Sequence, residues 1–170
     1  MGKVLKRAFP STIPVMAGYL FLSFAYGISM RESGFGIGWT AVISLFVYAG
    51  SMQFALIGLL LSPFAPLTAV LMTLMVNARH LFYGISMLEP YGQAGKYKPY
   101  MIFSLTDETY SLVVSGAPKD VDAAQWYTAV SALNQFYWVV GSIFGVIMGN
   151  VIPSQIASAN WTPRMNKICS

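Results

Sequence analysis

The stretch WTAVISLFVYAGSMQFALIGLLL (Trp39–Leu61) contains no charged residue and no histidine. About 20 mainly apolar residues are enough to cross the hydrocarbon core of a bilayer. The uncharged region continues on both sides, because none of the 46 residues between Glu32 and Arg79 is Asp, Glu, Lys, Arg or His. A second such region, of 41 residues, separates Asp122 from Arg164. Each region has room for a crossing, so the sequence predicts membrane-spanning helices.

The overall composition supports the same class of protein. Charged residues make up 9% of the chain, apolar residues make up 56%, and the mean hydropathy is +0.59. A soluble domain has about 25% charged residues, because its surface is in water. The net charge of +4 comes from basic residues beside apolar segments, which is typical of cytoplasmic anchoring and not of nucleic-acid binding. We therefore expect an all-α, polytopic membrane helix bundle.

The hydropathy pattern predicts about five hydrophobic elements. We place them at residues 9–30, 39–61, 67–88, 100–115 and 126–152. Pro10 and Pro14 fall in the opening turns of the first element, where a missing amide proton is tolerated. The second element is expected to be uninterrupted until the turn SPFAP (Ser62–Pro66), whose two prolines end it.

Basic residues predict the orientation of the chain. Lys3, Lys6 and Arg7 favour a cytoplasmic amino terminus in the inner (plasma) membrane. If each of the first three elements crossed once, the loop with Lys96 and Lys98 would lie outside. We therefore expect one element not to cross.

The third element is our candidate for this exception. We interpret it as re-entrant or broken, entering through residues 67–76 and leaving through 81–88, which is permitted where protein or a water-filled cavity surrounds the backbone. The loop 89–99 and the carboxyl-terminal tail would then face the cytoplasm, and the loop 117–123 would face outside.

Polar residues interrupt two of the apolar elements. NARHLFYG (Asn77–Gly84) and SLTDETY (Ser104–Tyr110) place charged groups in apolar surroundings. Such a charge costs at least about 2.5–3.5 kcal/mol on insertion scales, so it pairs or lines a cavity. We expect Arg79 and Asp107 to be partners. Three interpretations stay open: a pair that only fixes helix packing, side chains that reach the interface, and a polar cluster on a substrate path.

Two further patterns concern packing and symmetry. In GSIFGVIMG, residues Gly141, Gly145 and Gly149 recur every four positions, which favours close approach of another helix; the alternative is that glycine is simply common in membrane helices. The pentapeptide YGISM occurs at Tyr26–Met30 and Tyr83–Met87. We interpret it as chance or a shared interfacial position, the alternative being a remnant of an internal duplication.

The chain lacks the sequence features of an enzyme. It has no nucleophile motif and no cluster of His and carboxylates at metal-ligand spacing, and GFGIG (Gly34–Gly38) does not have the spacing of a dinucleotide fingerprint. We expect no catalytic activity, no metal and no cofactor. The single cysteine, Cys169, excludes an intramolecular disulfide.

Three motifs in order carry a resemblance to a known family. YAGSMQF (Tyr48–Phe54), NARHLFYG (Asn77–Gly84) and LTDETY (Leu105–Tyr110) resemble the AzlC family of branched-chain amino-acid permease subunits. The resemblance implies an AzlC-like transmembrane domain over residues 1–153. The polar tail, residues 154–170, matches no family segment, so the chain is expected to be truncated at its carboxyl terminus relative to the family.

The resemblance also implies a function. Members of the family export branched-chain amino acids with a small membrane partner of the AzlD type. The polar motif positions then divide into candidate substrate residues, Gln53, Asn77, Arg79 and Thr106, and candidate proton-coupling residues, Asp107, Glu108 and His80. Physically, Arg79 suits the substrate carboxylate, and one of the two acidic residues suits the ammonium group while the other carries the proton. A channel, or a membrane subunit that does not transport because of the truncation, remains an alternative.

Overall fold

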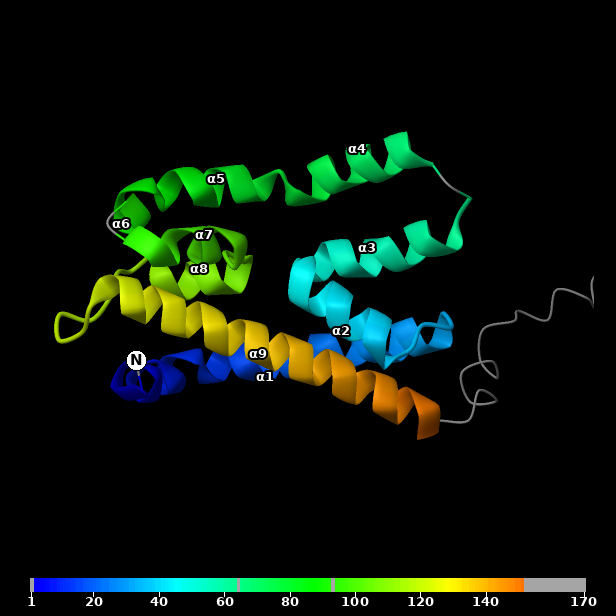
Figure 1. Cartoon of the computed structure of the whole chain (residues 1–170), viewed down its shortest axis with the longest axis horizontal. Helices are drawn as coiled ribbons and strands as arrows, with labels where there is room; N and C mark the ends of the chain where they lie inside the picture. The colour runs from blue at the N-terminus through cyan, green and yellow to red at the C-terminus, as the bar shows by residue number, and fades with distance from the viewer. Residues whose placement is uncertain (1, 64, 93, 152–170) are drawn as a thin grey trace, which may run out of the picture.

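The computed structural model describes residues 2–63, 65–92 and 94–151. All regular elements in these ranges are helical, which confirms the all-α prediction. They are α1 (Gly2–Glu32), α2 (Ile37–Phe46), α3 (Gly50–Leu61), α4 (Pro66–Asn77), α5 (Arg79–Ser86), α6 (Leu88–Gly92), the short 3-10 helix η1 (Gly95–Tyr97), α7 (Lys98–Phe103), α8 (Asp107–Val113) and α9 (Ala123–Val151) (Figure 1). The predicted tail, residues 154–170, lies outside the described residues.

The two longest helices, α1 and α9, form the base of the bundle. With 31 and 29 residues, both are long and apolar enough to cross a membrane by length and composition. They lie side by side along most of their length (Figure 1). Gly141, Gly145 and Gly149 face α1: an added Cβ would overlap the Ser23 side chain at Gly141 and the Phe24 carbonyl oxygen at Gly145. The glycine face of α9 therefore allows the backbones to approach closely.

Helix α1 begins earlier than expected. It starts at Gly2, so Pro10 and Pro14 stand inside the helix, and their predicted position in its opening turns is wrong. Each proline removes one backbone hydrogen bond to the carbonyl four residues earlier. The carbonyls left without a donor are those of Lys6 and Pro10, and both residues are exposed.

The second predicted element is not uninterrupted, and this prediction is wrong. Helix α2 ends at Phe46, the chain reverses over residues 47–49, and α3 returns toward the end of the bundle at which α2 begins (Figure 1). Tyr48 has a φ of 33°, in the left-handed region that non-glycine residues rarely adopt. Gly50 follows, and a Cβ there would lie 2.8 Å from the ring of Trp138. The re-entrant element is therefore this one.

Side-chain amides make the reversal possible in apolar surroundings. The last carbonyls of a helix have no intrahelical partner, and in a membrane each must find one within the protein. At the end of α2, the Leu45 carbonyl accepts from Gln135 Nε2 at 3.1 Å, and the Ile43 carbonyl, which already accepts from the Val47 amide, also accepts from Gln53 Nε2 at 3.0 Å. Side chains of α3 and α9 thus supply hydrogen bonds to the end of α2.

The third predicted element is broken, as one of our two interpretations had it, but it is not re-entrant. Helices α4 and α5 follow one another in the same direction along the length of the bundle (Figure 1). The residue between them, Ala78, keeps a right-handed helical conformation, with φ −53° and ψ −37°. No residue at this break reverses the chain, so the two helices together traverse the molecule.

The fourth predicted element is also two half-helices instead of one. Helix α7 ends at Phe103, the chain turns over residues 104–106, and α8 runs back (Figure 1). This α7–α8 hairpin enters the bundle from the end opposite to the α2–α3 hairpin. The two turns meet in the middle, where the ring centroids of Tyr48 and Phe103 lie 6.4 Å apart. The bundle therefore contains two opposed helical hairpins.

Matching helix ends in the two halves of the bundle are separated by the same number of residues. Helices α2 and α7 end 57 positions apart, and α3 and α8 begin 57 positions apart, as do α4 and α9. The two copies of YGISM have the same separation. The first unit comprises α1–α3 and the second comprises α4–α8. Because these two units run in opposite directions (Figure 1), we interpret the pentapeptide as matching positions of an inverted repeat and not as chance.

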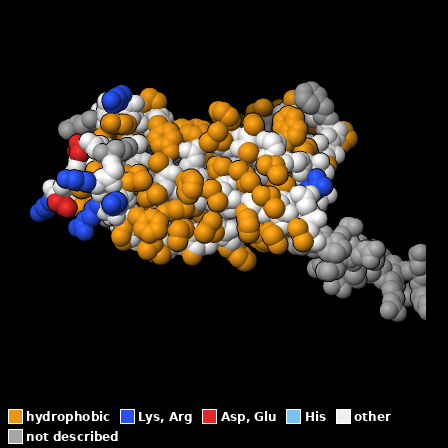
Figure 2. Space-filling view, turned by 60° about the horizontal axis from the view of Figure 1, so that its bottom comes forward, with side chains coloured by type: hydrophobic (Ala, Val, Ile, Leu, Met, Phe, Trp, Pro, Cys, Tyr) orange, Lys and Arg blue, Asp and Glu red, His pale blue; other side chains and the backbone are white. Residues whose placement is uncertain are grey.

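On the face that Figure 2 shows, charged side chains gather mainly at one end, and apolar side chains cover the middle. Arg7 Nε lies 3.7 Å from Asp120 Oδ2, which places the loop 117–123 at the same end as the amino terminus. Its predicted position on the opposite side is wrong, because the α7–α8 hairpin returns the chain to the end it came from. The loop 89–99 lies at the amino-terminal end, where Tyr91 and Ala94 share a buried cluster with Ala8.

This topology predicts a labelling pattern. In a Cys169→Ser background, we expect Ser33→Cys and Lys119→Cys to be modified from opposite faces of the membrane. The amino-terminal end carries the greater positive charge and is expected in the cytoplasm. A membrane-impermeant maleimide added to intact cells should then label position 33 and not position 119. Lys96→Cys is the control and should behave like position 119; external labelling of both loops would contradict the topology.

Candidate functional site

A cavity of about 270 Å³ lies where the turns of the two hairpins meet. Cavities of a few hundred Å³ are the usual size for small-molecule sites. Its wall combines residues of both hairpins with residues of α1, α5 and α9: Tyr19, Leu22, Tyr48, Ala49, Gly50, Ser51, Phe54, Arg79, His80, Thr106, Asp107, Glu108 and Trp138.

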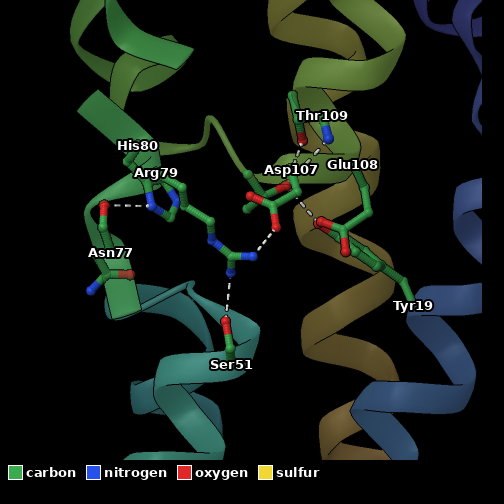
Figure 3. A network of polar contacts seen from close by, with 9 residues as sticks. Tyr19, Ser51, Asn77, Arg79, His80, Asp107, Glu108 and Thr109 are labelled. Carbon is green, nitrogen blue, oxygen red and sulfur yellow. Dashed lines mark hydrogen bonds and ion pairs between the residues drawn. The ribbon is translucent and has the colours of Figure 1, made fainter. Parts of the chain in front are cut away.

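An ion pair crosses this cavity from one hairpin to the helix beside it (Figure 3). Arg79, the first residue of α5, pairs through Nη1 with Asp107 Oδ2 and donates through Nη2 to Ser51 Oγ at 2.6 Å. The side chains of Arg79 and Asp107 are 41% and 31% exposed. Arg79 Nε and Asp107 Oδ1 have no hydrogen-bond partner. These two atoms of the pair are thus buried and have no partner within the protein.

The acidic residues owe their position to the start of α8. Thr106 is the N-cap of this helix, and its hydroxyl accepts a hydrogen bond from the Thr109 amide at 3.3 Å. Threonine is a favourable N-cap, and carboxylates in the first turn are stabilised by the positive end of the helix dipole. The sequence Thr-Asp-Glu therefore both starts the helix and delivers Asp107 and Glu108 to the cavity.

The side chain of Glu108 has a neutral hydrogen-bond partner. The hydroxyl of Tyr19 donates to Glu108 Oε2 at 2.8 Å and lies 2.6 Å from Thr106 Oγ1 (Figure 3). Thr106 Oγ1 also donates to Thr109 Oγ1 at 3.1 Å, and Asn134 Nδ2 of α9 donates to the same oxygen at 3.1 Å. A buried chain of hydroxyl groups therefore connects the carboxylate to α9.

His80 and Asn77 lie at the break between α4 and α5. His80 lines the cavity, and its Nδ1 is 3.2 Å from the backbone carbonyl oxygen of Asn77. The side chain of Asn77 is not part of the cavity wall, and its Oδ1 has no hydrogen-bond partner. The structure thus brings His80 to the site and places Asn77 beside it.

Gln53 lies behind the cavity wall and not on it. It is fully buried, its Nε2 donates to the Ile43 carbonyl, and its Oε1 accepts from Trp138 Nε1 at 2.6 Å. Both ends of the amide are therefore used within the protein. Gln53 therefore connects α3 to α2 and α9 through hydrogen bonds. Its direct contact with a substrate stays a prediction.

Sequence reasoning missed eight members of the cavity wall, and four of these have polar side-chain atoms: Tyr19, Tyr48, Ser51 and Trp138. Ser51 stands inside the quoted motif YAGSMQF and could have been found there. Tyr19 and Trp138 could not, because aromatic residues are frequent throughout these helices. Their rings pack edge to face, with centroids 5.2 Å apart, and connect α1 to α9 beside the site.

The inverted repeat explains the composition of the cavity wall. Residues that occupy matching positions, 57 apart, line the same cavity: Leu22 and Arg79, Ala49 and Thr106, Gly50 and Asp107, Ser51 and Glu108. In each pair the first unit supplies a small or apolar residue and the second a polar or charged one. The site therefore lies between the two units, and its charges come from the second unit.

An apolar helical bundle with two opposed helical hairpins and an ion pair in the cavity between their turns defines a polytopic helical membrane protein. More specifically, the chain belongs to the AzlC family, whose model, described as AzlC protein, matches residues 14–152. This match confirms the resemblance drawn from the three motifs.

Several relatives support the assignment. A Bacillus subtilis (strain 168) protein named branched-chain amino acid transport protein AzlC is 46% identical over 148 residues, covering 86% of this chain and 58% of the relative. An uncharacterized membrane protein of Haemophilus influenzae is 41% identical over 159 residues, covering 92% and 65%. The inner membrane protein YgaZ of Escherichia coli is 23% identical over 143 residues, covering 82% and 58%.

The chain spans about three-fifths of the length of these relatives. No solved structure matches it.

Proposed function

We propose that the protein is a membrane carrier subunit for branched-chain amino acids, a transporter and not an enzyme. The observation that carries the proposal is the Arg79–Asp107 ion pair, which lies in a cavity between two opposed half-helix turns and retains an unpaired donor and an unpaired acceptor. A zwitterionic amino acid has one anionic and one cationic group and can engage both partners of such a pair. The relative named as a branched-chain amino acid transport protein supports this substrate class.

Each part of the substrate has a suitable partner in the cavity. Arg79 can bind the carboxylate with two parallel hydrogen bonds, and the start of α3 beside it, where no side chain caps the helix, favours an anion. Asp107 faces the ammonium group. The rings of Phe54 and Trp138 and the side chain of Leu22 provide apolar surface for an aliphatic side chain.

The arrangement of the hairpins favours a carrier over a pore. Transporters built from inverted repeats bind their substrate between the repeats, near discontinuous helices, and expose the site to each side in turn. Here the α2–α3 and α7–α8 hairpins enter from opposite ends and their turns meet at the cavity (Figure 1). Movement of one hairpin would open the site to one side only.

The remaining features are proposed from the family resemblance and from charge. We place the protein in the inner (plasma) membrane with a cytoplasmic amino terminus, because most basic residues flank that end. We propose net export, coupling to protons through Asp107, Glu108 or His80, and a small AzlD-type membrane subunit as partner.

Counterflow in proteoliposomes tests the function. We expect external valine to accelerate the release of labelled internal valine, with saturation, because a carrier exchanges one bound substrate for another. The measurement is made with the chain alone and with an AzlD-type subunit co-reconstituted. Valine flux without saturation or exchange would indicate a pore, and absence of flux in both preparations would indicate a subunit that does not transport.

A further inference from the structure

Two carboxylates reach the cavity from adjacent positions of α8, and their partners differ. Asp107 pairs with the guanidinium of Arg79, whereas Glu108 accepts a hydrogen bond from the hydroxyl of Tyr19. Among the described residues, Glu108 has no ion-pair partner. The titratable and charged side chains of the cavity wall, over all elements that form it, are Tyr19, Tyr48, Arg79, His80, Asp107 and Glu108.

The two carboxylates are unequal as proton carriers. Adding a proton to Asp107 removes the counter-ion of Arg79, which is unfavourable for a cation placed between apolar helices. Adding a proton to Glu108 removes a charge that has no cationic partner of its own. The difference in partners therefore favours Glu108 over Asp107 as the group that carries the proton.

Tyr19 can form a hydrogen bond with Glu108 whether the carboxyl group is ionised or protonated. Its single hydroxyl proton has two acceptors within reach, Glu108 Oε2 at 2.8 Å and Thr106 Oγ1 at 2.6 Å. When Glu108 is ionised, Tyr19 donates to the carboxylate and Thr106 donates to Tyr19. When Glu108 is protonated, it donates to the Tyr19 oxygen, Tyr19 donates to Thr106, and Thr106 donates to Thr109 Oγ1 at 3.1 Å. Both states leave these hydroxyl groups paired within the protein.

We propose that Glu108 binds and releases the coupling proton, that Tyr19 is its positioning residue, and that Asp107 stays ionised as part of the amino-acid site. The proposal rests on the proposed carrier function. Glu108 takes its proton from water reaching the cavity from one side of the membrane and returns it to water on the other side. Tyr19 is only 3% exposed, and its ring is fixed against Trp138, so its hydroxyl stays directed at the carboxylate.

The test separates coupling from transport. Wild-type protein and variants are reconstituted in vesicles, and valine counterflow at several pH values is compared with net valine flux driven by an imposed pH gradient. For Glu108→Gln we expect counterflow that no longer depends on pH, at whatever rate the variant sustains, and loss of the flux driven by the gradient. For Asp107→Asn we expect loss of counterflow at every pH.

Two controls complete the design. Tyr19→Phe removes the hydroxyl and keeps the ring, so we expect a shift in the pH at which counterflow is half-maximal, an effect that a purely structural role would not produce. Glu89→Gln removes an exposed carboxylate outside the cavity and should retain the wild-type pH profile. Gradient-driven flux that survives in Glu108→Gln and disappears in Asp107→Asn, with counterflow retained, would overturn this inference and leave the carrier function standing. Absence of saturable exchange in the wild type would overturn the carrier function itself.

Discussion

Gly145→Leu is expected to prevent α1 and α9 from packing and to give the largest loss of stability of any single substitution considered. A Cβ at position 145 would overlap the Phe24 carbonyl oxygen and approach the Cα of Gly27, and both are backbone atoms. Backbone cannot rotate away as a side chain can, so the helices must separate. Overpacking typically costs about 1–3 kcal/mol, and we expect at least about 3 kcal/mol here.

The measurement is thermal unfolding of the purified protein in detergent. For a chain of this length, about 3 kcal/mol corresponds to a fall in melting temperature of roughly 6–12 °C. Gly18→Leu is the matched control, because Gly18 lies on α1 and an added Cβ there meets nothing within 4 Å. Its melting temperature should stay close to that of the wild type. Equal losses in the two variants would show that glycine content, and not the α1–α9 contact, determines the effect.

Hydropathy predicted that the chain is a membrane helix bundle but not how its elements run. The residues from Trp39 to Leu61 are apolar throughout, so a spanning helix and a re-entrant hairpin look the same on a hydropathy scale. The reversal depends on Tyr48, on the close contact of Gly50 with Trp138, and on side-chain amides that satisfy the end of α2. One of these amides, that of Gln135, comes from α9, far along the chain, and so the sequence of the hairpin alone does not contain the signal.

The basic residues correctly predict that one of the first three elements does not cross the membrane, but the third element is the wrong candidate. The positive-inside rule requires one element not to cross, but it counts crossings and does not identify which element reverses. The third element holds polar residues, Arg79 and His80, in its middle. Those residues instead mark a break at which the helix continues, and the uncharged second element is the one that turns back.

Of the residues that line the cavity, the sequence predicted mainly the charged ones. An arginine and an aspartate in apolar segments are each costly unless they are paired, so the sequence indicated Arg79 and Asp107 as partners. Tyr19 carried no such signal, since tyrosine is also common at membrane interfaces. The spacing of 57 residues was visible in YGISM, but only the helix boundaries of the structure give it meaning.

Substitutions at positions 79 and 107 distinguish a substrate-binding role of the ion pair from a helix-packing role. We expect Arg79→Leu to raise the valine concentration for half-maximal counterflow about 10- to 100-fold, because hydrogen bonds to charged groups contribute about 1.5–3 kcal/mol. Arg79→Lys keeps the charge without the two-pronged geometry and should fall between Arg79→Leu and the wild type.

In the double variant Arg79→Asp/Asp107→Arg the ion pair can form again with reversed polarity. If the pair only fixes helix packing, both the melting temperature and the counterflow should recover. If Arg79 receives the substrate carboxylate beside the start of α3, counterflow should stay at the level of Arg79→Leu, because an aspartate at position 79 repels the carboxylate. The melting temperature should recover only in part, because the new arginine lies in the first turn of α8, where cations are unfavourable. Full recovery of counterflow would contradict the binding role and leave a packing role for the pair.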